Sequence, residues 1–392
     1  MNKILFVVDE RQMGGVNILL EDYLKNINRN DKSITVLILH NNGDRFNNLP
    51  DDIKTICINR ELDIVDLSLS ELIRKKRFFK AIKKAIFSVY IKTGYIEKVI
   101  RRIRRKYNIN DYDVEIAFKD GFCQLFTAYG NSKKKISWLH NDYSRNNFIQ
   151  KYKETFIKVH KNFDYIVAIS SEIKEHFCDL YHNEDKILVI NNYIDENKIE
   201  IMAKEKCDLE VDDSKLNLLC IGRLSYEKGF DRVLNALNRL KDGYKDLEQR
   251  LRINIIGDGE ERSNLESMKE NYELNNVISF IGRDNNPYKY INKHDFVLVP
   301  SRYEAYCLVM IEALINKVPL LTTDVASVKE ITSNGKYGII MENSEEGIYN
   351  TLVNLLDNKE IAYEYKKNVS EYSYIETNKK IIDAVNAILE ID

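Results

Sequence analysis

Two glutamates eight residues apart are the strongest chemical signal in the sequence. Glu304 lies in a loop after an apolar run at 296–299, and Glu312 lies in the apolar segment predicted to form the next helix, from about Tyr306. Two carboxylates placed in this way could bind two separate hydroxyl pairs of one ligand, and the free amides at the helix N-terminus could hold an anionic group between them. Open parallel sheets bind ligands at the carboxyl ends of their strands, which favours this role over that of a cap or surface charge.

Arg223 and Lys228 form a second candidate site. They lie between an apolar run at 216–221 and a helical pattern over 230–240. Two cations beside a helix N-terminus suit a diphosphate, because they can form charge-assisted and bidentate hydrogen bonds. Taken alone, the pair could equally well form ordinary surface ion pairs.

Two weaker signals lie in the first half of the chain. Gly14 and Gly15 follow an apolar run at 4–8 and would let the backbone approach a phosphate or sugar closely, although most such pairs are only turns. His140 follows an apolar run at 135–139. A lone histidine is more often structural, but the polar neighbours of His140 in a βα loop favour contact with a ligand.

Two series of short apolar runs must position these residues. Runs that are apolar throughout suit strands covered by helices on both faces, and their alternation with helical patterns predicts parallel doubly wound sheets. The expected strands are 4–8, 34–39, 53–58, 114–118, 135–139, 165–169 and 187–190, and then 216–221, 253–256, 277–280, 296–299, 318–322 and 338–341. We therefore expect an α/β protein with two Rossmann-like domains, at 1–192 and 215–375, a linker near 192–214, and a terminal helix within 376–392 that packs back toward the first domain.

The composition limits the possible classes of function. The 392 residues are 44% hydrophobic and 31% charged, which excludes a disordered chain. The formal net charge of −2 offers no global argument for a nucleic-acid partner. The six cysteines form no CxxC pair, which predicts reduced thiols, and no apolar stretch is long enough to predict a membrane span. We therefore expect a cytoplasmic protein.

The segment 74–106 departs from this charge balance. It contains fourteen Lys and Arg and a single acid, Glu97, and apolar residues recur in it every three to four positions. This pattern predicts one or two basic amphipathic helices. Three interpretations are open: a solvated helical face packed on the first sheet, a docking surface for anionic lipid head groups or a lipid diphosphate, and RNA binding. Each cation near an acidic leaflet adds roughly 1 kcal/mol, which favours lipid, and no known RNA motif accompanies the charge.

Together, the candidate residues resemble glycosyltransferase family 4, retaining enzymes of the GT-B fold, whose two Rossmann-like domains face each other across a cleft. The resemblance covers nearly the whole chain. The matching positions are the two-glutamate signature, the diphosphate-binding pair, the first-loop glycines and the active-site histidine: Glu304 with Glu312, Arg223 with Lys228, Gly14 with Gly15, and His140. Relatives usually have Glu-Gly-Phe-Gly where this chain has Glu-Ala-Tyr-Cys at 304–307. This departure affects the prediction of which donor is bound more than the prediction of the reaction type.

The resemblance implies a role for each residue. Glu304 would bind hydroxyls of the donor sugar, and Glu312 would bind the ribose diol. Arg223 and Lys228 would neutralise the charge that develops on the departing diphosphate, and His140 would hydrogen-bond the sugar. The other implied donor-binding positions are Gly14, Gly15, Arg283, Tyr306, Cys307 and Leu308. No metal or cofactor is expected, because in this family cations and helix amides take its place.

The resemblance therefore predicts a metal-independent retaining glycosyltransferase that uses a UDP-sugar. With the basic segment, it predicts a polyprenyl-diphosphate-linked saccharide as acceptor and peripheral association with the inner face of the cell membrane through residues 74–106. The expected product is a capsule, an O-antigen or a similar surface polysaccharide. The alternatives are a soluble glucosyltransferase, a nucleotide-sugar epimerase and a non-catalytic sugar-nucleotide sensor. A soluble transferase would be insensitive to anionic lipid, and an epimerase would need acid–base carboxylates and no acceptor.

Two further motifs are given no role. Asp111-Tyr112-Asp113 looks like a metal-binding DxD motif, but it stands at the amino end of the strand predicted at 114–118, on the wrong side for a ligand. Gly257-Asp258-Gly259 looks like a dinucleotide fingerprint, but it lacks the third glycine and a suitably placed acid.

Overall fold

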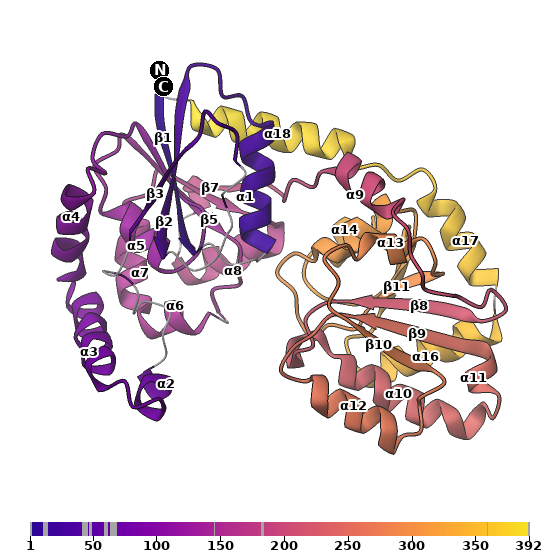
Figure 1. The fold of residues 1–392 in the computed structure, drawn as a ribbon. Coiled ribbons are helices and arrows are strands. Elements are labelled where there is room, and N and C mark those ends of the chain that lie inside the picture. Colours follow the sequence, from indigo (N-terminus) through magenta and orange to yellow (C-terminus); the bar gives the residue numbers. More distant parts are fainter. Residues whose placement is uncertain are drawn as a thin grey trace. The chain divides into compact units, whose positions relative to one another are not determined.

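The computed structural model shows two compact units, which we call unit 1 and unit 2 (Figure 1). Unit 1 comprises Met1–Ile194 and Thr377–Asp392, and unit 2 comprises Asp195–Glu376. The residues that the structure describes are 2–10, 15–40, 46, 49–58, 62, 69–144, 146–181, 184–358 and 360–390. Each unit contains one parallel sheet with helices packed against it, so the predicted class of two Rossmann-like α/β domains is confirmed.

Unit 1 has a seven-stranded parallel sheet in the order β3-β2-β1-β4-β5-β6-β7. Its strands are β1 (Asn2–Glu10), β2 (Lys32–His40), β3 (Lys54–Cys57), β4 (Val114–Ala117), β5 (Lys134–Leu139), β6 (Tyr165–Ala168) and β7 (Ile187–Val189). The strand order reverses at β1, which lies between β2 and β4. Such a reversal leaves a crevice at the carboxyl ends of the strands, where ligands of open α/β sheets bind.

The helices of unit 1 include both parts of the predicted basic segment, as α3 and α4. They are α1 (Gly15–Asn26), α2 (Leu69–Arg74), α3 (Phe78–Thr93), α4 (Ile96–Lys106), α5 (Phe122–Ala128), α6 (Asn147–Lys151), α7 (Lys153–His160), α8 (Ser171–Tyr181) and the 3₁₀ turn η1 (Glu184–Lys186). The terminal helix α18 (Ile375–Leu389) joins them, and beyond its end Glu390 pairs with Lys32. No described helix has both the length and the apolar character that crossing a membrane requires.

Unit 2 has a six-stranded parallel sheet in the order β10-β9-β8-β11-β12-β13, with the reversal at β8. Its strands are β8 (Leu216–Ile221), β9 (Leu251–Ile256), β10 (Ile278–Gly282), β11 (Phe296–Val299), β12 (Leu320–Thr323) and β13 (Gly338–Met341). Its helices are α9 (Glu196–Ala203), η2 (Tyr226–Lys228), α10 (Phe230–Gly243), α11 (Leu247–Arg250), α12 (Arg262–Asn271), α13 (Tyr288–Ile291), α14 (Leu308–Ile315), α15 (Val328–Ile331), α16 (Glu345–Asp357) and α17 (Glu360–Val369).

Two local features differ from the sequence-based description. The helix that carries Glu312 begins at Leu308 rather than near Tyr306, with Cys307 as its N-cap residue in extended conformation. The segment expected to be a linker contains helix α9, whose N-terminus is capped by Asp195, because the carboxylate of this residue accepts a hydrogen bond from the amide of Lys198 at 3.0 Å.

Candidate active site

Lys228 and Glu304 meet where β8 and β11 end. Lys228 is the last residue of η2, which follows β8, and its Nζ donates a hydrogen bond to Glu304 Oε1 at 2.7 Å. The same oxygen accepts a hydrogen bond from Ser301 Oγ at 2.6 Å. Burial alone would lower the pKa of Lys228, but the charge of Glu304 raises this pKa above its usual value. The structure thus joins one cation and one carboxylate of the predicted site as an ion pair.

The loops that carry these two residues are held close together. Gly229 has a left-handed backbone with φ of 69°, and a Cβ atom there would lie 2.1 Å from the carbonyl oxygen of Pro300. The amide of Arg302 donates to the carbonyl of Glu227 at 2.8 Å, and the Arg302 guanidinium also forms a bidentate pair with Asp231. These contacts fix the position of Lys228 relative to the loop of Glu304.

Arg223 occupies a different place from Lys228. Its Nη2 donates to Glu227 Oε1 at 2.7 Å, and its side chain is 65% exposed. In the described part of unit 2, therefore, only Lys228 of the two predicted diphosphate-binding cations contacts Glu304. A diphosphate at Lys228 would have to draw the exposed Arg223 side chain away from Glu227, whose own side chain is 22% exposed.

Glu312 is separate from this ion pair. It lies on α14, and Tyr288 Oη donates to its Oε1 at 3.2 Å. Burial raises the pKa of the Glu312 carboxyl to about 7, although the hydrogen bond from Tyr288 and the charge of Lys198 act in the opposite direction. A carboxyl that titrates near neutrality next to a tyrosine hydroxyl is suited to binding hydroxyl groups of a ligand.

The residues at the N-terminus of α14 point their side chains into the protein. Tyr306 Oη lies 3.1 Å from Tyr374 Oη in a buried contact, and Cys307 is buried as well. Burial raises the pKa of both the Tyr306 hydroxyl and the Cys307 thiol. A ligand at this helix end would therefore meet the backbone of these residues and of Leu308, rather than the two buried side chains.

The remaining predicted residue of unit 2, Arg283, is exposed directly after β10. After the neighbouring strand β9, Gly257 and Gly259 have a structural explanation. A Cβ atom on Gly257 would lie 1.8 Å from the carbonyl oxygen of Gly222, and one on Gly259 would lie 2.3 Å from that of Leu224. These glycines let the loop after β9 pass directly against the loop that carries Arg223, so they do not require a dinucleotide.

In unit 1, Gly15 begins α1 after β1, whereas Gly14 lies outside the described residues. His140 directly follows β5 and is only 6% exposed, and its ring packs in one cluster with the rings of Phe118 and Trp138. Burial, with a smaller effect of the charge of Lys119, lowers the pKa of His140 to about 3, so its ring is neutral at physiological pH. Its Nε2 atom is buried and has no hydrogen-bond partner among the described residues.

The structure adds Asp120, which the motif search missed. Asp120 follows β4, and its Oδ2 accepts hydrogen bonds from the amide of His140 at 3.1 Å and from Asn141 Nδ2 at 2.7 Å. Burial raises the pKa of the Asp120 carboxyl to about 6. Its position after a parallel strand was an available signal, but the contact with the His140 loop depends on the pairing of β4 with β5.

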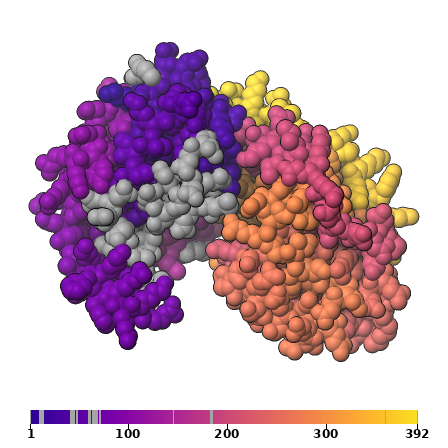
Figure 2. Space-filling view, viewed as in Figure 1, coloured from indigo at the N-terminus to yellow at the C-terminus, as the bar shows by residue number. Residues whose placement is uncertain are grey.

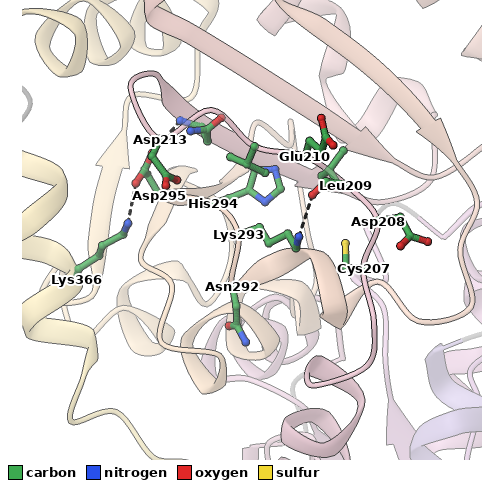
Figure 3. Close-up of a pocket in the computed structure, with 12 residues that line it drawn as sticks. Cys207, Asp208, Leu209, Glu210, Asp213, Asn292, Lys293, His294, Asp295 and Lys366 are labelled. Carbon is green, nitrogen blue, oxygen red and sulfur yellow. Dashed lines mark hydrogen bonds and ion pairs between the residues drawn. The ribbon is translucent and has the colours of Figure 1, made fainter.

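A cavity of about 1050 Å³ lies elsewhere in unit 2, and Figure 3 shows the residues that line it. It lies near the amino ends of β8 and β11, with Asn217 and Asp295 among its lining residues. Lys293 Nζ donates to the carbonyl of Leu209, and Lys366 pairs with Asp295. None of the predicted site residues lines this cavity, because they follow the carboxyl ends of the strands.

Comparison with protein families bears on the unit that contains Lys228 and Glu304. Residues 201–374 match the family "Glycosyl transferases group 1". This range includes Arg223, Lys228, Arg283, Glu304 and Glu312, and so all the predicted residues of unit 2. In the described residues, no group of three or more His, Cys, Asp or Glu side chains is arranged to hold a metal ion.

Two curated relatives and one solved structure extend the comparison. An uncharacterized 41.2 kDa protein in the cps region of Klebsiella pneumoniae is 31% identical over 189 residues, which are 48% of this chain and 49% of that protein. The Campylobacter jejuni N-acetylgalactosamine-N,N'-diacetylbacillosaminyl-diphospho-undecaprenol 4-alpha-N-acetylgalactosaminyltransferase is 28% identical over 38% of this chain and 40% of that enzyme. The chain thus spans about half the length of the curated relatives that it matches.

The structural comparison covers far more of the chain. The crystal structure of Anabaena Alr3699/HepE in complex with UDP and glucose superposes with a TM-score of 0.70 over 99% of this chain and 100% of that one, at 18% identity. At this identity the likeness shows the fold alone. Together with the family match, it identifies the two Rossmann-like units as a GT-B fold.

Proposed function

We propose that the protein is a retaining glycosyltransferase that transfers a sugar from a UDP-sugar to a saccharide acceptor. The observation that carries this proposal is the 2.7 Å contact between Lys228 and Glu304 at the strand-order reversal of unit 2. The cation suits a diphosphate and the carboxylate suits sugar hydroxyls, so the pair has the chemistry to bind the centre of a nucleotide sugar. The UDP and glucose in the Anabaena structure support UDP as the nucleotide.

In this proposal the residues of unit 2 divide the donor between them. Lys228 and Arg223 stabilise the negative charge that develops on the departing diphosphate, and Glu304 accepts hydrogen bonds from the sugar. Glu312 binds the ribose diol and Arg283 contacts the base. The backbone amides at Tyr306, Cys307 and Leu308 donate to phosphate or sugar oxygens at the N-terminus of α14.

We propose donor-binding roles for residues of unit 1 as well. The backbone of Gly15 approaches donor phosphate or sugar, and the neutral ring of His140 hydrogen-bonds the sugar; the same role expected of Gly14 falls outside the described residues. Asp120 positions His140 by accepting the hydrogen bond from its amide. The cations and helix amides take the place of a metal ion, so we propose that activity needs no added metal.

The proposed reaction proceeds on one face of the sugar. The bond between the anomeric carbon and the diphosphate oxygen breaks as the acceptor hydroxyl attacks from the same side, and the proton of that hydroxyl moves to the departing diphosphate. The sugar passes through an oxocarbenium-like transition state, and its anomeric configuration is retained. Lys228 acts mainly in this transition state, because the charge on the leaving group is then increasing.

We further propose that the acceptor is a polyprenyl-diphosphate-linked saccharide at the inner face of the cell membrane, and that nucleic acid is not a partner. The name of the Campylobacter relative, which contains a diphospho-undecaprenol, supports a lipid-linked acceptor. The cps region of the Klebsiella relative supports a role in the synthesis of a capsule or similar surface polysaccharide.

A donor panel tests the proposed function. Purified protein without added metal is incubated with UDP-, GDP-, ADP- and dTDP-sugars, and both thermal stabilisation and nucleotide release are measured. We expect one UDP-sugar to raise the melting temperature and to release UDP slowly, and Lys228→Ala to lower the rate of this release by about 10²–10³. Release that requires a divalent cation would contradict metal independence. Stabilisation without release, even with a lipid-linked acceptor, would favour the non-catalytic sensor.

A further inference from the structure

Helix α3 exposes an apolar face that no described residue covers. Phe79 is 85% exposed, and Phe78, Ile82, Ile86 and Val89 are between 45% and 60% exposed. Spacings of three and four residues from Phe79 to Val89 place these side chains on one face of the helix. A contiguous exposed stripe of this kind, unlike a single exposed side chain, indicates an interaction surface.

The opposite face of α3 is anchored to unit 1. Phe87 is buried with its ring centroid 5.3 Å from that of Phe122, and the hydroxyls of Ser88 and Tyr152 lie 2.7 Å apart. Thr155 Oγ1 donates to the carbonyl of Ile91 at 3.1 Å. The helix is therefore docked on one side, and its exposed stripe is held outward by this packing.

Helix α4 is also basic and amphipathic, but its apolar side chains are in a different environment. Its apolar residues Ile96, Ile100 and Ile103 are buried in unit 1. Arg104 is buried against Glu115, and the side chain of Arg101 pairs with Glu97. The apolar side of α4 is thus already covered, whereas the apolar stripe of α3 is not covered by any residue that the structure describes.

Charge surrounds the stripe on α3. Residues 74–92 contain eight Lys and Arg and no Asp or Glu. Among these cations, Lys76, Arg77 and Lys83 are exposed. Lys83 is next in the sequence to Ile82, which belongs to the stripe. In Figure 2 the segment α2–α3 lies at the lower edge of unit 1. Apolar side chains next to cations complement the acyl boundary and the phosphates of an anionic lipid layer.

We propose that α3 inserts shallowly into an anionic lipid surface, with Phe78, Phe79 and Ile82 at the acyl boundary and Lys76 and Lys83 on the lipid phosphates. This inference deepens the proposed function, because it names the helix and the mode by which the protein reaches a lipid-linked acceptor. RNA would use the cations but would leave five apolar side chains exposed, and a lipid surface accommodates both groups.

Vesicle co-sedimentation of the full chain tests this proposal. The probes are phosphatidylcholine vesicles and vesicles of equal parts phosphatidylcholine and phosphatidylglycerol, at low and high salt. We expect the protein to bind the anionic vesicles only, and binding to fall about tenfold in the double variant Phe79→Ser with Ile82→Ser at both salt concentrations. The variant Lys76→Gln with Lys83→Gln should lose binding mainly at low salt, where electrostatic attraction is strongest.

Tyr363→Ser is the matched control, because Tyr363 on α17 is 75% exposed but belongs to no such stripe. This variant should bind vesicles like the unchanged protein, and the fluorescence of the single tryptophan, Trp138, should confirm that each α3 variant is folded. Unchanged binding of the Phe79/Ile82 variant would overturn the proposal, as would self-association through α3 in the absence of lipid. Thermal stabilisation by the UDP-sugar should persist in the α3 variants, so failure of vesicle binding and failure of donor binding are distinguishable.

Discussion

Lys228 Nζ lies 2.7 Å from Glu304 Oε1, across the carboxyl ends of two neighbouring strands of one parallel sheet. The two side chains neutralise each other's charge, and the Ser301 hydroxyl donates a hydrogen bond to the same carboxylate oxygen of Glu304. A nucleotide sugar would supply both with new partners, a phosphate for the ammonium and hydroxyls for the carboxylate. On this account, donor binding exchanges an internal ion pair for two contacts with the ligand.

Replacement of the cations should affect turnover. We expect Lys228→Ala to lower kcat by about 10²–10³, the size of effect that follows removal of one group stabilising a developing negative charge. Arg223→Ala should lower kcat in the same direction, because Arg223 is proposed to join the diphosphate in the transition state. The measurement is steady-state release of UDP from the donor. Arg239→Ala, which removes an exposed pair with Glu346 on α16, is the control and should leave kcat unchanged; near-normal turnover of Lys228→Ala would contradict the assignment.

Glu312 should make folding stability depend on pH. Burial raises its pKa from the usual 4.5 to about 7, so between these values the folded protein retains a proton that the unfolded chain has released. The folded state therefore binds more protons, and the contribution of Glu312 to stability falls as the pH rises through this window. Glu312→Gln has no such proton to lose. Its melting temperature should rise relative to that of the unchanged protein between pH 5 and pH 8, and a constant difference would contradict the pKa shift.

The same carboxyl should affect donor binding. An ionised carboxylate accepts hydrogen bonds from both ribose hydroxyls, so affinity for a UDP-sugar should increase as the pH rises through about 7. A UDP-sugar is the suitable ligand, because both of its phosphates are esterified and do not titrate in this range. Isothermal calorimetry from pH 6 to pH 8 measures the effect. In Glu312→Gln the affinity should be lower and independent of pH.

Gly257 should tolerate no side chain. Its φ of 144° is unfavourable for other residues, and an added Cβ would lie 1.8 Å from the carbonyl oxygen of Gly222. We expect Gly257→Ala to destabilise unit 2 by at least about 2 kcal/mol. Gly243→Ala is the matched control, since nothing lies within 4 Å of a Cβ atom there, and it should be neutral or stabilising by up to about 1 kcal/mol. Differential scanning calorimetry of both variants tests the contrast.

The buried pair Arg104–Glu115 should be essential for the stability of unit 1. Both side chains are almost fully buried, so removal of one leaves an uncompensated charge in the protein interior. We expect Arg104→Met to cost about 3–5 kcal/mol. Arg101→Ala, which breaks the exposed pair with Glu97 on the same helix, should cost only about 0.3–0.5 kcal/mol. Urea denaturation followed by the fluorescence of Trp138, on β5 of unit 1, reports both values, and equal costs would contradict this prediction.

The sheets were predictable from the sequence because parallel strands buried on both faces leave a local signature. Runs such as 4–8 and 296–299 are apolar throughout, and each corresponds to a strand in the structure. The N-terminus of α14 was predicted two residues early, because Tyr306 and Cys307 are apolar enough to continue the helical pattern. In the structure both residues lie outside the helix: Cys307 has an extended backbone, and the Tyr306 hydroxyl makes a tertiary contact with Tyr374.

The parts of the site that depend on tertiary contacts were less predictable. The sequence placed Arg223 and Lys228 on one loop, but it could not show that Glu227 pairs with the first and Glu304 with the second. Asp120 lacks a motif and acquires its partner only when β4 pairs with β5. Likewise, α3 and α4 have the same periodicity, and only the fold decides which apolar stripe is covered.

The most direct test of the central claim is a calorimetric titration of UDP into three proteins without added metal: the unchanged chain, Lys228→Ala and Arg239→Ala. The account predicts saturable binding of UDP to the unchanged chain and to Arg239→Ala. It predicts at least tenfold weaker binding to Lys228→Ala, because this variant lacks the ammonium that would contact the diphosphate. Equal affinity of all three proteins for UDP would contradict the assignment of Lys228 and Glu304 as the centre of the donor site.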